Sequence, residues 1–276
     1  SSLLFINKII IKIEKKRDIH QQIHRLIVST HKKKKDTPTL GGIAIFLSII
    51  LINKNKSQRQ QIIDKIPIRI SLNGIKGKSI ITNLVSNILI EAGYKVIGKT
   101  ANESSDIILG LQNGSDDEYS KLQHKTNNDK FSVLKNASEL GVDAVIYENI
   151  DADSASKKVS KFNELNENIA VISEISEDYV EEDDKLVQSF AQVIPYEGYL
   201  VTTNNNYTDY FKSIARERNT KVIIADNSKI TYKYLDLFDY DDVSVENAAL
   251  SIAVGEALGI DEKTCLRGMV NINTKR

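Results

Sequence analysis

Apolar and polar positions follow two different patterns along the chain from Ile66 onward. Short runs of consecutive apolar residues alternate with longer stretches in which apolar residues recur every three or four positions. The short runs predict strands buried on both faces, and the longer stretches predict helices. The expected strands are Ile66–Leu72, Lys95–Gly98, Ala144–Tyr147, Ala170–Ile175, Tyr199–Thr202 and Lys221–Ala225; the expected helices are Ile80–Ala92, Ser154–Leu165, Asp184–Val193, Tyr207–Glu217 and Val245–Leu258.

This alternation predicts the fold class. Strands without a polar face, separated by helices, are typical of a mostly parallel sheet with helices on both faces. We therefore expect an α/β domain over residues 65–276. A polar loop is expected at Gln112–Asp129.

Residues 1–64 have a different texture, rich in Ile and Lys, and predict a helical segment close to a membrane. Leu40–Ile52 is the most apolar run, but its 13 residues fall short of the roughly 20 that span a bilayer. Two interpretations stay open: a buried or interfacial helix, and a short anchor supported by flanking lysines. The polar stretch Asn53–Lys65 is expected to be a linker.

Composition narrows the class of protein. Of 276 residues, 41% are hydrophobic and 27% are charged, which argues against a disordered chain and against a polytopic membrane protein. The single cysteine, Cys265, excludes an intrachain disulfide framework and a cysteine-cluster zinc site. Cys265 falls in an expected helix and is interpreted as a core residue.

The zero net charge conceals a strong asymmetry. Residues 1–60 contain 13 Lys and Arg against three acids, so the remainder contains 24 basic and 34 acidic residues. A basic, apolar start on an acidic body indicates contact with an anionic membrane surface or with nucleic acid. Phe5 and Phe46 are the only aromatic residues in the basic segment, which argues against a platform that stacks single-stranded nucleic acid and favours the membrane surface.

One turn carries the candidate chemistry. After the first expected strand the chain reads Asn-Gly-Ile-Lys-Gly-Lys-Ser over residues 73–79, and an apolar helix follows. Glycines allow backbone N–H groups to surround phosphate oxygens, and the helix start adds its positive dipole end. In such a loop Lys78 would contact the β- and γ-phosphates and Ser79 would ligate Mg²⁺. The alternative is an ordinary glycine turn with a surface lysine.

Longer stretches of sequence resemble a known family. The segment IPIRISLNGIKGKSIITNLVSNILIEAGYKVIGKT is similar to the start of the poly-γ-glutamate synthase ligase subunit of the PgsB/CapB type, in the Mur ligase superfamily. The stretches ASELGVDAVIYE, IPYEGYLVTTNNNYTDYFKSIARERNTKVIIADNSKIT and VENAALSIAVGEALGIDEKTCLRGMVN continue the likeness. It covers about residues 53–272 and implies a Mur-ligase-like ATP-binding domain.

The resemblance implies roles for individual residues. Asn73, Gly74, Gly77, Lys78, Ser79 and Asn247 would bind ATP, and Ser79 and Glu148 would bind Mg²⁺. Lys78 and Glu148 would be the catalytic pair, and Thr100 would lie near the substrate. Alternatives remain at two positions, where Glu148 is a solvated acid at a strand end and Asn247 is a helix cap.

The implied reaction is ATP-dependent γ-glutamyl amide formation through an acyl phosphate, with glutamate or a glutamyl polymer as substrate. The resemblance also implies membrane-bound partner subunits and a place at the cytoplasmic face of the cell membrane. Three departures motivate an alternative. The family's Glu-Asp-His motif reads Glu177-Asp178-Tyr179 here, and the polar loop Gln112–Asp129 replaces the Gly-Pro-Asn-Ile-Gly-Glu stretch that the family has after the position of Thr100. The family's C-terminal domain is also not found in this sequence. The alternative function is a nucleotide-binding module without ligase activity.

A second, shorter resemblance lies near the start. Residues 31–46 (HKKKKDTPTLGGIAIF) look like the first cytoplasmic loop and following helix of polyprenyl-phosphate sugar-phosphate transferases of the MraY/WecA type. The many membrane helices and Asp-rich motifs of those enzymes are missing from the sequence. No activity is expected from this segment.

Overall fold

The computed structural model describes Lys54 and residues 57–99, 107–110, 130–149, 166–175, 184–238 and 243–270. The expected N-terminal helical segment, the apolar run Leu40–Ile52, the helix Ser154–Leu165 and the loop Gln112–Asp129 lie outside these residues. So does the segment that resembles sugar-phosphate transferases. Residues 62–276 belong to one compact unit, which contains nearly all of the described structure.

A seven-stranded sheet in the order β3-β2-β4-β1-β5-β6-β7 organises the described residues. Strand β1 lies at its centre, between β4 and β5, and pairs with both in parallel. The remaining pairs are parallel as well, except that β2 and β3 are antiparallel. The strands are β1 (Ile68–Asn73), β2 (Val96–Lys99), β3 (Ile107–Gly110), β4 (Ala144–Glu148), β5 (Ile169–Ile172), β6 (Tyr199–Thr202) and β7 (Lys221–Ile224).

The predicted fold class is confirmed. All six expected strands are present, with ends shifted by up to three residues. The strand that sequence reasoning missed is β3, an antiparallel edge strand of four residues. Such a short segment between polar residues has too little apolar pattern to stand out.

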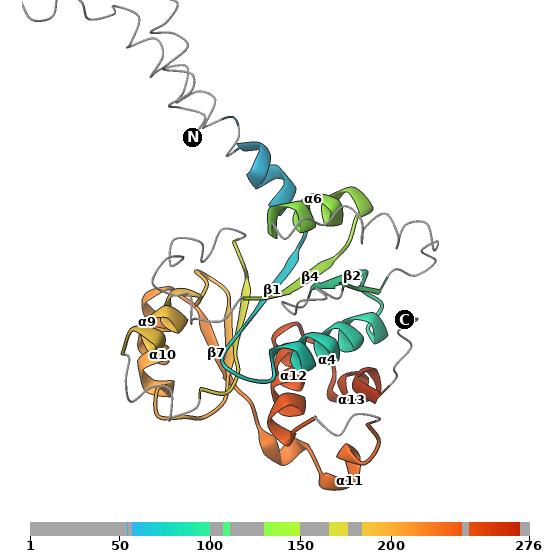
Figure 1. The fold of residues 1–276 in the computed structure, drawn as a ribbon, viewed down its shortest axis with the longest axis vertical. Helices are drawn as coiled ribbons and strands as arrows, with labels where there is room; N and C mark the ends of the chain where they lie inside the picture. The colour runs from blue at the N-terminus through green and yellow to red at the C-terminus, as the bar shows by residue number, and fades with distance from the viewer. Residues whose placement is uncertain are drawn as a thin grey trace, which may run out of the picture. The chain divides into compact units, whose positions relative to one another are not determined.

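Helices α4 (Lys78–Glu91), α12 (Val245–Ala257) and α13 (Glu262–Val270) gather on one face of the sheet (Figure 1). Helix α4 has no charged residue between Lys78 and Glu91, as expected for a helix covered on more than one side. Its apolar side chains pack on β1 and on α12 in one cluster. That cluster includes Ile68, Ile70, Leu72, Ile81, Val85, Leu89, Leu250, Ala253 and Val254.

The opposite face is covered by α6 (Lys130–Leu140), α9 (Asp184–Gln192) and α10 (Thr208–Glu217). Leu134 and Ala137 of α6 pack against Ile97 and Val145. Side chains of α9 and α10 pack against Ala170, Ile172 and Leu200. Helices therefore cover both faces of the parallel strands. This explains why the strands are runs of consecutive apolar residues without a polar face. Two short helical turns, η3 (Asn227–Lys229) and α11 (Tyr232–Leu235), follow β7.

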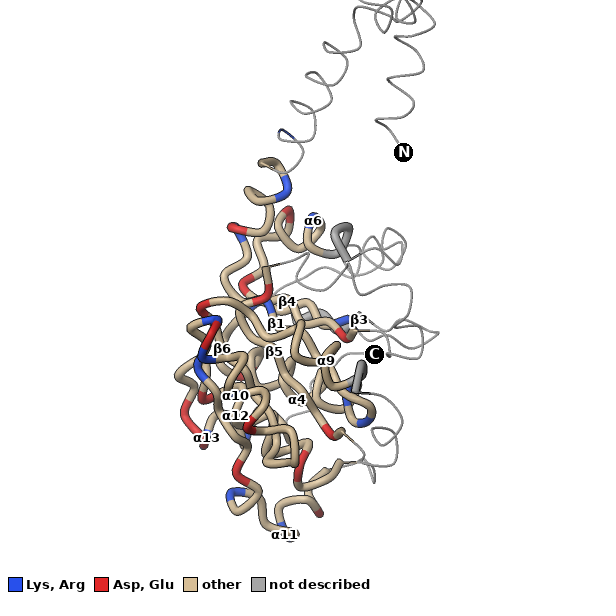
Figure 2. The backbone as a smooth tube through the Cα atoms, turned by 90° about the vertical axis from the view of Figure 1, so that its left-hand side faces the viewer, with Lys and Arg blue, Asp and Glu red and all other residues tan. Residues whose placement is uncertain are grey.

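Positively and negatively charged residues are interspersed along the described body (Figure 2). Part of the predicted linker Asn53–Lys65, residues 57–63, is helical. At the end of this helix, Ile63 is 3% exposed and packs in the cluster of Ile97 and Leu134, with Ile62 against it. The boundary between residues 1–64 and 65–276 as domains stays a prediction.

Candidate functional site

The glycine-containing turn lies between β1 and α4, at the carboxyl end of the central strand. Gly74 has φ +123° and Gly77 has φ +78°, conformations that glycine adopts at little cost. Helix α4 begins directly after Gly77, which supplies no side-chain cap, and no acidic residue lies in the first turn. The N–H groups at the start of α4 are therefore not capped by a side chain, and their dipole favours an anion.

Three side chains converge at this turn. Lys78 is only 8% exposed, and its ammonium group donates a hydrogen bond to the Gly74 carbonyl oxygen at 2.8 Å. The Ser79 hydroxyl donates to Glu148 Oε2 at 3.1 Å. Glu148 is the last residue of β4 and is 6% exposed, so it is not a solvated strand-end acid. A buried cation, a hydroxyl and a carboxylate thus lie together at the carboxyl ends of the central strands β1 and β4.

Asn73 is placed at the loop, but its side chain is turned into the protein. Its amide nitrogen donates to the Val171 carbonyl oxygen at 3.1 Å and to the Ser71 hydroxyl at 3.2 Å. Its amide oxygen accepts a hydrogen bond from Asn149, which follows Glu148 directly. Asn73 is 2% exposed, and its buried side chain links the start of the loop to β5 and to Asn149.

Ser173 supports the same loop from β5. Its hydroxyl lies 3.1 Å from the Asn73 carbonyl oxygen and 2.7 Å from that of Lys76, and its backbone N–H donates to Asn73 O at 2.9 Å. One residue further, the Glu174 carbonyl oxygen accepts from the Ile75 N–H at 3.1 Å. The loop is therefore bonded to the strand that neighbours its own.

Asn247 approaches the loop from the other side. It lies in the first turn of α12, and a Cβ placed on Gly77 would come within 2.5 Å of Asn247 Oδ1. The alternative interpretation of Asn247 as a helix cap is wrong: Ser244 caps α12 and accepts a hydrogen bond from the Asn247 N–H at 3.1 Å. The Asn247 side chain is thereby left to face the loop.

A hollow of about 340 Å³ adjoins this edge of the sheet. It lies past the ends of β5, β6 and β7, where parallel sheets place ligands. Its lining is mainly polar: Glu174, Ile175, Thr203, Asn204, Asn205, Ala225, Asp226, Asn227, Ser228 and Glu246. A larger hollow of about 610 Å³, between the amino ends of β6 and β7 and helix α10, lies at the opposite edge and contains none of the loop residues.

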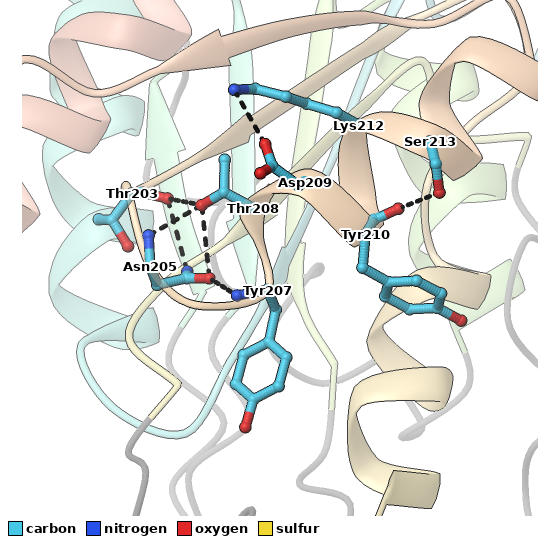
Figure 3. A network of polar contacts seen from close by, with 8 residues as sticks. All are labelled: Thr203, Asn205, Tyr207, Thr208, Asp209, Tyr210, Lys212 and Ser213. Carbon is cyan, nitrogen blue, oxygen red and sulfur yellow. Dashed lines mark hydrogen bonds and ion pairs between the residues drawn. The ribbon is translucent and has the colours of Figure 1, made fainter.

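Hydrogen bonds fix one wall of the smaller hollow, where β6 leads into α10 (Figure 3). The Asn205 N–H donates to the Thr208 hydroxyl at 2.8 Å, and the Tyr207 N–H donates to Asn205 Oδ1 at 2.9 Å. The Thr208 hydroxyl lies 3.3 Å from the Thr203 carbonyl oxygen. These contacts make the wall a defined turn at the helix start.

A buried polar row continues from Asn73 along β1. The Tyr147 hydroxyl donates to the Glu167 carboxylate. Burial raises the pKa of Tyr147 well above its ordinary value, and the negative charge of Glu167 raises it further. Burial likewise lowers the pKa of Arg69, against the opposing effect of Asp64 and Glu167. Tyr147 therefore keeps its proton at neutral pH and remains a hydrogen-bond donor to Glu167.

The ligands available for a metal are few. In the described part of the chain, no three His, Cys, Asp or Glu side chains come together. Mg²⁺ needs no such cluster, because it binds through one or two protein oxygens together with phosphates and water. The hydroxyl of Ser79 and the carboxylate of Glu148 are hard oxygen donors of that kind. The pair fits the ion that the sequence predicted.

The structure thus brings six predicted residues to one place: Gly74, Gly77, Lys78, Ser79, Glu148 and Asn247. Asn73 is adjacent but faces inward, while Thr100 and Tyr179 lie outside the described residues. Sequence reasoning missed Ser173 and Asn149. The available signal was weak: each is a small polar residue at the carboxyl end of a strand that pairs with β1.

Within the described ranges, no helix is both long and apolar enough to cross a membrane. Most of the segment expected to lie close to one, residues 1–64, is outside those ranges. The membrane assignment therefore stays a prediction.

Comparison with known proteins gives two sequence relatives. The chain is 39% identical over 232 residues to the PGA synthase CapB of Bacillus subtilis strain 168, covering 83% of this chain and 58% of that protein. It is 37% identical over 236 residues to the capsule biosynthesis protein CapB of Bacillus anthracis, covering 84% of this chain and 50% of that protein. The chain thus spans about half the length of these relatives. No family model matches.

Solved structures share the fold. A bifunctional folylpolyglutamate synthase/dihydrofolate synthase with Mn, AMPPNP and L-glutamate bound superimposes with a TM-score of 0.55 at 16% identity, over 79% of this chain and 61% of that one. Escherichia coli FolC in complex with DHPP and ADP gives a TM-score of 0.54 at 15% identity, over 78% and 59%. The resemblance to CapB-type proteins is confirmed: most of the chain is similar in sequence to two CapB proteins, and its α/β fold is shared with the folylpolyglutamate synthases.

Proposed function

We propose that the chain is the ATP-binding part of an ATP-dependent amide ligase that forms γ-glutamyl bonds in poly-γ-glutamate capsule synthesis. The observation that carries this proposal is the convergence of Lys78, Ser79 and Glu148 on a glycine turn at the carboxyl end of β1. The likeness to two CapB proteins supports the substrate class, glutamate or a glutamyl polymer. The described residues offer no nucleophilic cysteine at this edge, since Cys265 is buried elsewhere.

Each residue has a distinct task in the proposed site. The loop and α4 amides bind the phosphates of ATP, and the Lys78 ammonium exchanges the Gly74 carbonyl for phosphate oxygens, which accept stronger charge-assisted hydrogen bonds. Ser79 and Glu148 would hold Mg²⁺, whose charge offsets that of the phosphates. Asn247 lies beside Gly77 and would contact the nucleotide from the start of α12.

The proposed reaction has two balanced steps. An oxygen of the glutamyl carboxylate attacks the γ-phosphorus as the bond to ADP breaks, which gives an acyl phosphate. The amine of the next glutamate then attacks the acyl carbon, phosphate leaves, and the nitrogen loses a proton. The chain contributes positioning and neutralisation of charge, with no covalent bond to protein.

We further propose that this chemistry takes place at the cytoplasmic face of the cell membrane, with membrane-bound partner subunits of a polymer synthase. The basic composition of residues 1–60 supports contact with an anionic membrane surface.

Lys78→Ala in the intact chain tests the site. Loss of a charge-assisted phosphate contact costs about 1.5–3 kcal/mol, so Mg-ATP affinity should fall roughly ten- to a hundredfold. The measurement is calorimetric titration with Mg-ATP and with a non-hydrolysable analogue. Lys135→Ala removes an exposed lysine from α6 and is the matched control. Equal affinity in Lys78→Ala and wild type would contradict the site.

Turnover separates the ligase from a binding module. With Mg-ATP and glutamate or a glutamyl oligomer, a ligase releases ADP and phosphate only when the carboxylate and amine substrates are present. Tight Mg-ATP binding without ADP release, even with partner subunits supplied, would favour the alternative of a nucleotide-binding module.

A further inference from the structure

We propose that Ser173 is a positioning residue that fixes the orientation of the phosphate-binding loop. It touches no substrate itself and acts through the backbone of residues 73–77. The identity of the ligand rests on the proposed function, but the effect of Ser173 on the loop does not.

The contacts of Ser173 concentrate on two peptide units of the loop. Its hydroxyl is 2.7 Å from the carbonyl oxygen of Lys76 and 3.1 Å from that of Asn73, and its N–H donates to Asn73 O. Ser173 is 1% exposed, so water does not compete for these bonds. Bonds to buried backbone carbonyls are costly to remove because the oxygens are left without a partner.

Peptide geometry converts these contacts into an orientation. Every peptide bond of the described residues is trans, so the N–H of each planar unit points away from its carbonyl. Drawing the carbonyls of Asn73 and Lys76 toward Ser173 therefore turns the N–H groups of Gly74 and Gly77 away from β5. Those two amides are the donors expected to surround phosphate oxygens. Without the Ser173 hydroxyl, the carbonyl of Asn73 or Lys76 could rotate toward the bound phosphate. Its partial negative charge would then repel the phosphate oxygens.

The fit around Ser173 is close. A Cβ on Gly74 would overlap the Ser173 hydroxyl and come within 3.0 Å of its backbone nitrogen. Gly74 is thus required both by its φ of +123° and by the side chain packed against it.

Ser173→Ala in the intact chain is the test, with Ser86→Ala as its matched control. Ser86 is also fully buried and donates to a backbone carbonyl, Thr82 O, at 2.6 Å, but it does so within α4 and not at the loop. The first measurement is amide hydrogen exchange of residues 72–79 without nucleotide. We expect about two- to tenfold faster exchange in Ser173→Ala and none of this change in Ser86→Ala.

The second measurement is Mg-ATP affinity by titration, which should fall by about the same two- to tenfold in Ser173→Ala alone. Loop exchange that is unchanged in Ser173→Ala, or raised equally by Ser86→Ala, overturns the proposal. If the wild-type chain fails to bind Mg-ATP, the proposed function fails, and hydrogen exchange still decides whether Ser173 positions the loop.

Discussion

Individual residues of the loop are constrained from two directions, by backbone conformation and by neighbouring side chains. Gly74 and Gly77 both have positive φ, and each is approached by a polar side chain from another element, Ser173 or Asn247. Either constraint alone would favour glycine. Together they tie the loop sequence to the packing of β5 and α12.

Gly74→Ala separates these two constraints when it is compared with Gly93→Ala. Gly93 has φ +90°, but an added Cβ there meets no atom within 4 Å. Gly93→Ala should cost only the conformational strain, about 1–3 kcal/mol. Gly74→Ala adds overlap with Ser173, so its free energy of unfolding should fall by at least about 1 kcal/mol more.

Urea denaturation of the two variants measures the difference, and Mg-ATP titration shows whether the loop is affected. Equal destabilisation by both alanines would mean that Ser173 moves aside freely. Only Gly74→Ala is expected to weaken nucleotide binding.

At the scale of elements, α4 is the helix on which the site depends. It begins at the loop, lies on β1, and is covered by α12 and α13. Gly268 of α13 allows the closest approach, because a Cβ there would lie 2.7 Å from Ile88 Cα and 2.9 Å from Asn87 O. Its neighbour Arg267 forms an exposed ion pair with Glu91 at 3.2 Å.

Gly268→Ala tests whether this backbone contact matters. Alanine stabilises an open helix position by roughly 0.5–1 kcal/mol relative to glycine, whereas overpacking against α4 costs about 1–3 kcal/mol. We expect net destabilisation in urea unfolding. Arg267→Ala is the control on the same helix and should change stability by less than about 1 kcal/mol. A stabilised Gly268→Ala variant would show that α13 is free to move away from α4.

The whole molecule combines an acidic body with a basic start. The asymmetry of roughly ten charges of each sign follows from composition, and the described body itself mixes both signs (Figure 2). Membrane attraction, if the proposal is right, must therefore come from residues 1–60. The run Lys32–Lys35 is its densest part.

Vesicle binding by the intact chain tests this. It should co-sediment with vesicles containing phosphatidylglycerol at ~50 mM salt and be released at ~500 mM salt, because salt screens surface charge. Replacing Lys32–Lys35 by glutamine should weaken binding more than tenfold, at about 1 kcal/mol per lysine. Replacement by arginine keeps the charge and serves as control. Equal binding to neutral vesicles would contradict an electrostatic contact.

The sequence by itself determined the fold class, six of the seven strands of the described sheet, and the position of the loop. These features depend on neighbours within a few residues: apolar runs specify buried strands, and Gly-x-x-Gly-Lys-Ser specifies a turn into a helix. The resemblance to CapB-type ligases added Glu148 and Asn247 to the predicted site residues. Local patterns did not indicate that residues 57–63 are helical, with Ile62 and Ile63 packed in the cluster of Ile97 and Leu134.

Only the tertiary structure decided how the site is assembled. Ser79 meets Glu148 across 69 residues, and Ser173 reaches Lys76 across 97. No local pattern encodes such pairs, since they arise from the order β4-β1-β5, which places three strand ends side by side. The inward turn of Asn73 and the role of Ser173 follow from that neighbourhood, because a buried polar group must find its partner wherever packing places one.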